Sequence, residues 1–246
     1  MKKGTVLIIA GLLIILSAVC LTGYNLYTAD AAYKDASDVL DQLQDLIPDV
    51  QTVPSEDKNE GTDTSNVHEG ETDSDGVSDE DGSSDVQIKP IAPQTPSYVL
   101  NPDIEMPVKT LNDQEYIGVL EIPDISLRLP VISKMSYPKL KKAPCRYSGS
   151  VYKDNLVIGA HCYEHFFAKL KTLTMGAQVK FIDVDGNLFV YEVIAKETIS
   201  KKSPYDLKTG DWELTLFTCP ILANTDTRIA MRCERIYPDK SVFNNK

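Results

Sequence analysis

Residues 212–219 read Trp212-Glu-Leu-Thr-Leu-Phe-Thr-Cys219, and residues 227–232 read Thr227-Arg-Ile-Ala-Met-Arg232. β-Branched and aromatic residues fill both runs, and the stretch between them contains Pro, Asn and Asp, so the sequence predicts two strands joined by a turn. The first strand ends on a thiol and the second begins with a guanidinium, that of Arg228. The predicted hairpin therefore carries a candidate catalytic pair at one end of a sheet.

Short runs of β-type composition extend upstream of this hairpin. Predicted strands cover residues 116–122 and 127–132, which flank a turn at Pro123, and residues 155–160, which end at His161. Residues 179–184 and 188–199 flank Asp185-Gly-Asn187, a strong hairpin signal. Residues 166–173 predict a helix, and residues 137–142 a single helical turn. About seven or eight short strands with one or two helices indicate a β-barrel or sandwich.

Residues 4–29 carry no acidic or basic side chain, and Leu, Ile, Val and Ala dominate from Val6 to Leu21. Such a run can cross a hydrocarbon core of about 30 Å as a helix. Lys2 and Lys3 predict that the N-terminus lies inside the cell and the following chain outside. A cleaved signal peptide is the alternative, but the apolar run exceeds the usual ~7–15 residues. We expect residues 1–29 to be a cytoplasmic tip and a single-pass anchor in the cell membrane.

Residues 30–97 read as a connection. Apolar positions recur every three or four residues over 31–47, which predicts an amphipathic helix ended by Pro48. Residues 49–96 carry two basic and thirteen acidic side chains with few large apolar ones, so we expect a disordered acidic stalk. Residues 98–246 form the predicted extracellular domain. With twenty basic and eighteen acidic side chains in 97–246, this part gives no electrostatic reason to expect a nucleic-acid partner.

Three side chains suit acyl transfer. Cys219 is the candidate nucleophile, since a free thiol has a pKa near 8.5 and attacks as a thiolate that a basic or cationic neighbour favours. His161 could supply that neighbour and then protonate a leaving amine. Arg228 stays protonated, so it could hold a carbonyl or an oxyanion. These roles require the three side chains to lie together in the fold, which their spacing in the sequence does not show.

Other interpretations of the same residues stay open. Cys145, Cys162 and Cys233 could form disulfides, although an odd total of five cysteines leaves one unpaired. Residues 161–165 spell H-x-x-E-H, an inverted zinc-protease pattern that needs both histidines on one helix, whereas His161 follows a predicted strand. Asp183 invites a calcium site, but the glycine of the next turn falls too early for an EF-hand loop.

The chain resembles the sortases. Thr215-Leu-Phe-Thr-Cys219 is similar to their TLxTC signature, Gly159-Ala-His161 to the strand end that carries their histidine, and Thr227-Arg228 to the position of their arginine. The resemblance covers about residues 115–236 and is carried by the signature, the order of the residues and the anchor together. It implies an eight-stranded sortase-type β-barrel with one or two short helices, preceded by the membrane helix and the acidic stalk.

The resemblance also implies an activity. Cys219 would cleave the Thr–Gly bond of an LPxTG-like sorting signal on a surface protein, with His161 as acid and base and Arg228 as carbonyl clamp. An amine of a peptidoglycan precursor or a pilin lysine would resolve the thioacyl enzyme. Thr218 is expected to shape the substrate site. No cofactor or metal is implied, although a calcium dependence stays open.

The choice of arginine, the sortase class and the function each have alternatives. Arg232 lies four residues beyond Arg228 on the same strand face and is the second choice for the clamp. Cys162 has no assigned role, and the short link over residues 200–211 argues against the class B form with its long helical insertion. An L,D-transpeptidase fits poorly, because its motif places the histidine close to the cysteine. A non-enzymatic, membrane-tethered wall-binding module is the remaining alternative, and it predicts a buried or disulfide-bonded Cys219.

Overall fold

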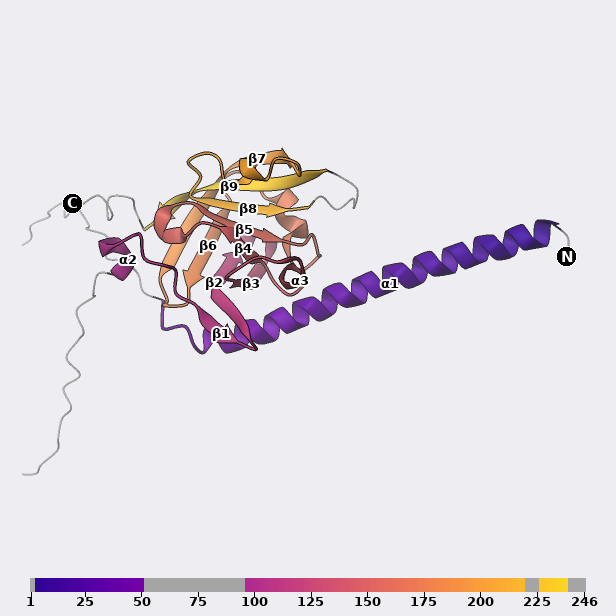
Figure 1. Cartoon of the computed structure of the whole chain (residues 1–246), viewed down its shortest axis with the longest axis horizontal. Helices are drawn as coiled ribbons and strands as arrows, with labels where there is room; N and C mark the ends of the chain where they lie inside the picture. Colours follow the sequence, from indigo (N-terminus) through magenta and orange to yellow (C-terminus); the bar gives the residue numbers. More distant parts are fainter. Residues whose placement is uncertain (1–2, 51–95, 220–225, 239–246) are drawn as a thin grey trace, which may run out of the picture. The chain divides into compact units, whose positions relative to one another are not determined.

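The computed structural model describes residues 3–50, 96–219 and 226–238, and eight of its strands close into a barrel (Figure 1). The order around the barrel is β2-β3-β4-β5-β8-β9-β7-β6, and β6 returns to β2. The predicted eight-stranded barrel is confirmed. Its strands are β2 (Gln114–Ile122), β3 (Leu127–Ile132), β4 (Cys145–Ser148), β5 (Leu156–Ala160), β6 (Gln178–Asp183), β7 (Leu188–Ser200), β8 (Leu214–Thr218) and β9 (Thr227–Tyr237).

The barrel is mixed, because two of its neighbouring pairs are parallel. These are β3 with β4 and β5 with β8, and every other pair is antiparallel. The short β1 (Lys109–Leu111) pairs with the start of β2, beside the part of β2 that pairs with β6. The predicted hairpins β2/β3 and β6/β7 are both present. Parallel pairing of β5 with β8 matters most here, since parallel strands end at the same edge of a sheet.

Apolar side chains fill the barrel because alternate residues of a strand point to opposite faces. On β8 the inward residues Leu214 and Leu216 are fully buried in the main core, as are Met231 and Cys233 of β9. Large rings complete this core: Phe166, Phe167, Phe181, Phe189 and Tyr191. Strand β2 is buried on both faces, because its outward residues Tyr116 and Val119 lie under the N-terminal helix.

Short helical segments connect the strands. They are α2 (Ser97–Leu100), η1 (Pro123–Ile125), α3 (Tyr137–Leu140), η2 (Val151–Lys153), η3 (Phe167–Thr172) and η4 (Pro204–Leu207). The turn predicted over 137–142 is α3, whose N-cap Ser136 accepts a hydrogen bond from the Lys139 amide. The helix predicted over 166–173 is the 3-10 segment η3. The β7–β8 link holds only η4, so the long insertion is absent from it, as expected.

Helix α1 spans Lys3–Gln44 as one continuous helix (Figure 1). Its apolar first part is long and apolar enough to cross a membrane, and its side chains are exposed, with Leu7 73% and Ile14 70% accessible. Its last turns pack on the barrel instead, where Leu43 is fully buried beside Tyr116 and Ile132. The predicted helix over 31–47 thus continues the apolar helix. The predicted disordered stalk lies mostly outside the described residues.

Candidate active site

His161 and Cys219 follow the ends of two adjacent parallel strands. Ala160, the last residue of β5, is paired in register with Thr218, the last residue of β8. Each candidate residue comes directly after its member of this pair, so their backbones leave the sheet side by side. Neighbouring strands lie about 4.8 Å apart, which is within reach of two side chains. The Thr218 hydroxyl is buried and donates a 2.9 Å hydrogen bond to the Ala160 carbonyl, which links the two strand ends.

Arg228 enters from the other side of Cys219. Strand β9 runs antiparallel to β8, and Ile229 is the register partner of Thr218. Arg228 precedes Ile229 and therefore lies at the same barrel end as the thiol. Its guanidinium is half-buried and donates a 2.9 Å hydrogen bond to the carbonyl of its neighbour Thr227. Three adjacent strands thus bring the three predicted residues to one end of the barrel.

Aromatic rings enclose the His161 imidazole. The ring of Tyr137 meets it edge-on at a centroid distance of 5.6 Å, and the ring of Tyr163 stacks on it at 5.1 Å. Its Nε2 is buried and has no hydrogen-bond partner among the described residues. Burial lowers the pKa of His161, and the nearby Lys141 ammonium lowers it further. The hydrogen-bonding capacity of Nε2 is therefore unused among the described residues.

Cys162 lies within electrostatic range of the candidate pair. Burial raises the pKa of its thiol, the neighbouring Cys219 raises it further, and Arg228 acts in the opposite direction. The Cys162 thiol is therefore less acidic than an ordinary exposed thiol. The structure places it close to the site without giving it a chemical role.

A buried apolar cluster adjoins the site on the outside of the barrel. His161, Cys219 and Arg228 share the outward alternation of β5, β8 and β9 with Val157, Phe217 and Ala230, which form one buried cluster with Ile199 and Leu207. Gly159 allows the ring of Phe217 to lie against β5, because a Cβ at this position would be only 2.4 Å from Phe217 Cζ. This contact is not predictable from the sequence, since a lone glycine in a strand does not reveal which side chain approaches it.

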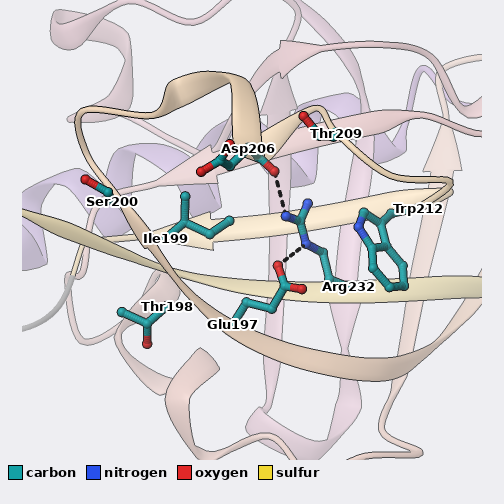
Figure 2. A pocket seen from close by; sticks show the side chains of 8 residues that line it. All are labelled: Glu197, Thr198, Ile199, Ser200, Asp206, Thr209, Trp212 and Arg232. Carbon is teal, nitrogen blue, oxygen red and sulfur yellow. Dashed lines mark hydrogen bonds and ion pairs between the residues drawn. The ribbon is translucent and has the colours of Figure 1, made fainter.

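Arg232, the second choice for the clamp, is engaged in a structural network (Figure 2). Its side chain is 3% exposed and forms a 2.9 Å ion pair with the Glu197 carboxylate. It also donates to the carbonyls of Asp206 and Leu207 at 2.7 and 3.1 Å and to the Thr215 hydroxyl at 3.0 Å. It thereby fastens η4 to the barrel wall. Arg228 is the arginine left available at the site.

An open pocket lies beside this network, between β7 and the β7–β8 link (Figure 2). Its lining is mostly polar, and the ring of Trp212 stands 5.6 Å from the Arg232 guanidinium. The Arg232 guanidinium already donates to four acceptors. We therefore interpret the pocket as a result of the packing of η4 against the barrel. The residues that line it are Glu197, Thr198, Ile199, Ser200, Asp206, Thr209, Trp212 and Arg232.

The alternative metal interpretations are not supported by the local geometry. Residues 161–163 are irregular and residues 164–166 form a turn, so the H-x-x-E-H pattern does not lie on a helix. His165 instead contacts α1. The Asp183 carboxylate accepts hydrogen bonds from the amides of Asp185 and Asn187, the Asn187 side chain and the Tyr152 hydroxyl, which makes it the organiser of the β6–β7 turn.

None of the five cysteines forms a disulfide, and Cys219 and Cys162 are half-buried. Burial raises the pKa of both Cys145 and Cys233 to about 12, so these two thiols are inert packing residues. A buried or disulfide-bonded Cys219, which the wall-binding alternative predicts, is not what the structure contains.

The aromatic surroundings of His161 are not predicted by the sequence pattern. Tyr137 comes from the segment between β3 and β4, and Lys141 from the same segment, and no local pattern connects them with a histidine at the end of β5. Tyr163 could have been noticed, because it follows His161 by two residues. The contact of Tyr137 with His161 depends on the tertiary structure alone, because the two residues are far apart in the sequence.

The barrel region matches one family model and several solved structures. Residues 120–236 match the family model of the sortase domain. Sortase A from Corynebacterium diphtheriae matches with a TM-score of 0.46 and 22% identity, over 51% of this chain and 63% of that chain. Sortase C1 from Streptococcus suis matches with a TM-score of 0.43 and 24% identity, over 49% and 73%.

A structure of Clostridium perfringens sortase C with the C-terminal cell wall sorting motif matches with a TM-score of 0.43 and 25% identity, over 49% of this chain and 70% of that chain. The matched region spans less than two thirds of the Corynebacterium sortase A chain. No curated protein sequence matches the chain significantly.

Proposed function

We propose, from the premise that residues 120–236 are a sortase domain, that the chain is a membrane-anchored cysteine transpeptidase with Cys219 as nucleophile. The observation that carries the proposal is the register of β5, β8 and β9, which brings His161, Cys219 and Arg228 to one barrel end. A thiol, an imidazole and a guanidinium together supply the nucleophile, the proton carrier and the charge stabiliser of acyl transfer.

The acylation step uses all three groups. The Cys219 thiolate attacks the threonine carbonyl carbon of an LPxTG-like sorting signal, and the oxygen that becomes negative is held by the Arg228 guanidinium. Collapse of this intermediate breaks the Thr–Gly C–N bond. His161 gives its proton to the leaving glycine nitrogen, and a thioester between threonine and Cys219 remains.

The deacylation step reverses the roles. An amine of a peptidoglycan precursor or a pilin lysine attacks the thioester carbon, and neutral His161 takes its proton. The C–S bond then breaks, an amide joins signal and acceptor, and the thiolate returns. A lowered pKa suits His161 to this step, because a larger share of the imidazole is neutral at a given pH.

The buried apolar cluster on the outside of the barrel is the proposed support beneath the bound sorting signal. Phe217 and Val157 of this cluster lie along β8 and β5 from Cys219, and the partly exposed Met135 and Tyr147 pack against it. Leu207 of η4 belongs to the same cluster, so the β7–β8 link packs beside it. Thr218 contributes indirectly, by fixing the strand ends through its hydroxyl. Residues 220–225, which belong to the predicted turn between β8 and β9, lie outside the described residues.

Location follows from α1. We propose that its apolar part is a single-pass membrane anchor with the N-terminus inside, and that the barrel works outside the cell on surface proteins. The proposed organisation is a tip and anchor over 1–29, a connection over 30–97 and the catalytic domain over 98–246. The first boundary falls inside α1, so anchor and connection share one helix.

The test is transpeptidation by the full-length chain in detergent. A library of LPxTG-type peptides is incubated with an amine acceptor, and the joined product is identified by mass spectrometry. We expect a product with the native chain, none with Cys219→Ala, and native amounts with the matched control Cys20→Ala, whose thiol lies in the apolar part of α1. Product formation that persists in Cys219→Ala would exclude the assignment.

A further inference from the structure

A basic segment, residues 134–142, lies between β3 and β4. It contains Lys134, Lys139, Lys141 and Lys142 and no acidic residue. Three of these lysines are exposed and Lys139 is half-exposed, and none of the four forms an ion pair with any residue of the described chain. Tyr137 of α3 is 68% exposed, and the Lys141 ammonium lies 5.4 Å above its ring. The segment is thus a cationic surface with one exposed ring.

The basic segment borders the candidate active site. The ring of Tyr137 meets the His161 ring at 5.6 Å, so the same side chain belongs both to the exposed surface and to the enclosure of the histidine. The single acid of residues 161–166 is Glu164, and it lies 3.8 Å from the Lys169 ammonium. Whatever covers the basic segment therefore comes close to His161.

Helix α1 contacts the loop that follows His161. The first contacts of α1 with the barrel, counted from its N-terminus, are with His165. Asp30 lies 3.6 Å from the His165 imidazole, and Tyr33 stacks on the same ring at a centroid distance of 4.4 Å. Leu43, farther along, is buried against β2 and β3. Asp30 is the first charged residue after the uncharged run of 4–29. The loop that continues from His161 is thus the part of the barrel nearest to the apolar part of α1.

We propose that the basic segment is a docking surface for the anionic lipid headgroups of the membrane that α1 crosses, so that the candidate active site opens toward the bilayer surface. The inference rests on the proposed membrane anchoring but not on the chemistry of Cys219. Lysines near an anionic surface each raise its occupancy about fivefold. A tyrosine beside them suits the headgroup region, because its ring is apolar and its hydroxyl polar.

The experiment measures lysine reactivity in the full-length chain. The protein is placed in nanodiscs of phosphatidylcholine alone or with about 30% phosphatidylglycerol, and acetylation rates are read by mass spectrometry. We expect phosphatidylglycerol to slow the acetylation of Lys134, Lys141 and Lys142 about fivefold or more, and about 0.5 M NaCl to remove the protection. Lys153 is the internal reference, since it precedes β5 and lies at the strand end opposite His161.

Charge-matched variants test the origin of the protection. Lys141→Gln with Lys142→Gln should abolish the slowing at Lys134, whereas Lys153→Gln with Lys180→Gln should preserve it. Equal rates in the two nanodiscs would overturn the proposal. Salt-sensitive protection of equal size in both would also overturn it, and would assign the surface to the acidic residues of this same chain. Loss of transpeptidation leaves these readouts unchanged, so the two proposals fail separately.

Discussion

Replacing Arg232 by alanine should destabilise the barrel without removing a catalytic group. The side chain is 3% exposed and serves four acceptors, among them the Glu197 carboxylate. Breaking a buried charge pair costs about 3–5 kcal/mol. We expect the lower end, about 3 kcal/mol, because Glu197 is 40% exposed and water can reach it through the pocket. For a domain of this size the melting temperature then falls by about 6–12 °C.

The matched control is Arg228→Ala, on the same strand. The Arg228 guanidinium is half-buried, and its hydrogen bond is to the adjacent Thr227 carbonyl, so we expect a loss below about 1 kcal/mol. Thermal unfolding followed by circular dichroism measures both variants, and transpeptidation is assayed well below either melting point. Arg232→Ala should retain activity there and Arg228→Ala should not. An Arg232→Ala chain that melts with the native protein would refute the structural role.

Three further perturbations follow from single contacts. Gly159→Ala places a Cβ 2.4 Å from the Phe217 ring, and the displaced ring should lower kcat about 10²-fold in a chain whose circular dichroism stays native; an undiminished kcat would contradict the contact. Leu43→Ala should weaken the seating of α1 on the barrel by about 2–5 kcal/mol, seen as faster amide exchange in residues 40–47, and native exchange rates would argue against it. Lys141→Gln should raise the pKa of His161, but not to its ordinary value, because the imidazole stays buried. An NMR titration should then show protonation at a higher pH, and an unchanged titration curve would exclude Lys141 as a cause of the lowered pKa.

The sequence predicted those parts of the fold that are encoded locally. The β6–β7 hairpin was predictable because Gly186 and its polar neighbours form the turn and the flanking strands alternate. The strand ends at Ala160 and Thr218 were predictable because short runs of β-type residues stop there. The helix over 166–173 was misjudged in type, because three- and four-residue apolar spacing does not distinguish a short 3-10 segment from an α-helix.

Neighbour relations between distant strands were beyond local patterns. Nothing in residues 156–160 and 214–218 states that β5 and β8 pair in parallel, and only the family resemblance suggested that His161 and Cys219 meet. The different roles of Arg228 and Arg232 were also not predictable from the sequence. Alternation places Arg228 and Arg232 on one face, but only packing shows that η4 uses the second.

Under the proposed roles, the arrangement of β5, β8 and β9 links catalytic competence to the completion of export. These neighbours in the barrel emerge in the order 156–160, 214–218 and 227–237, so a chain that crosses the membrane from its anchor presents the imidazole first and the guanidinium last. A chain halted before β9 would hold a thiol with no clamp beside it and an open barrel wall. The enzyme should therefore become active only when its final strand has passed the membrane and closed the sheet.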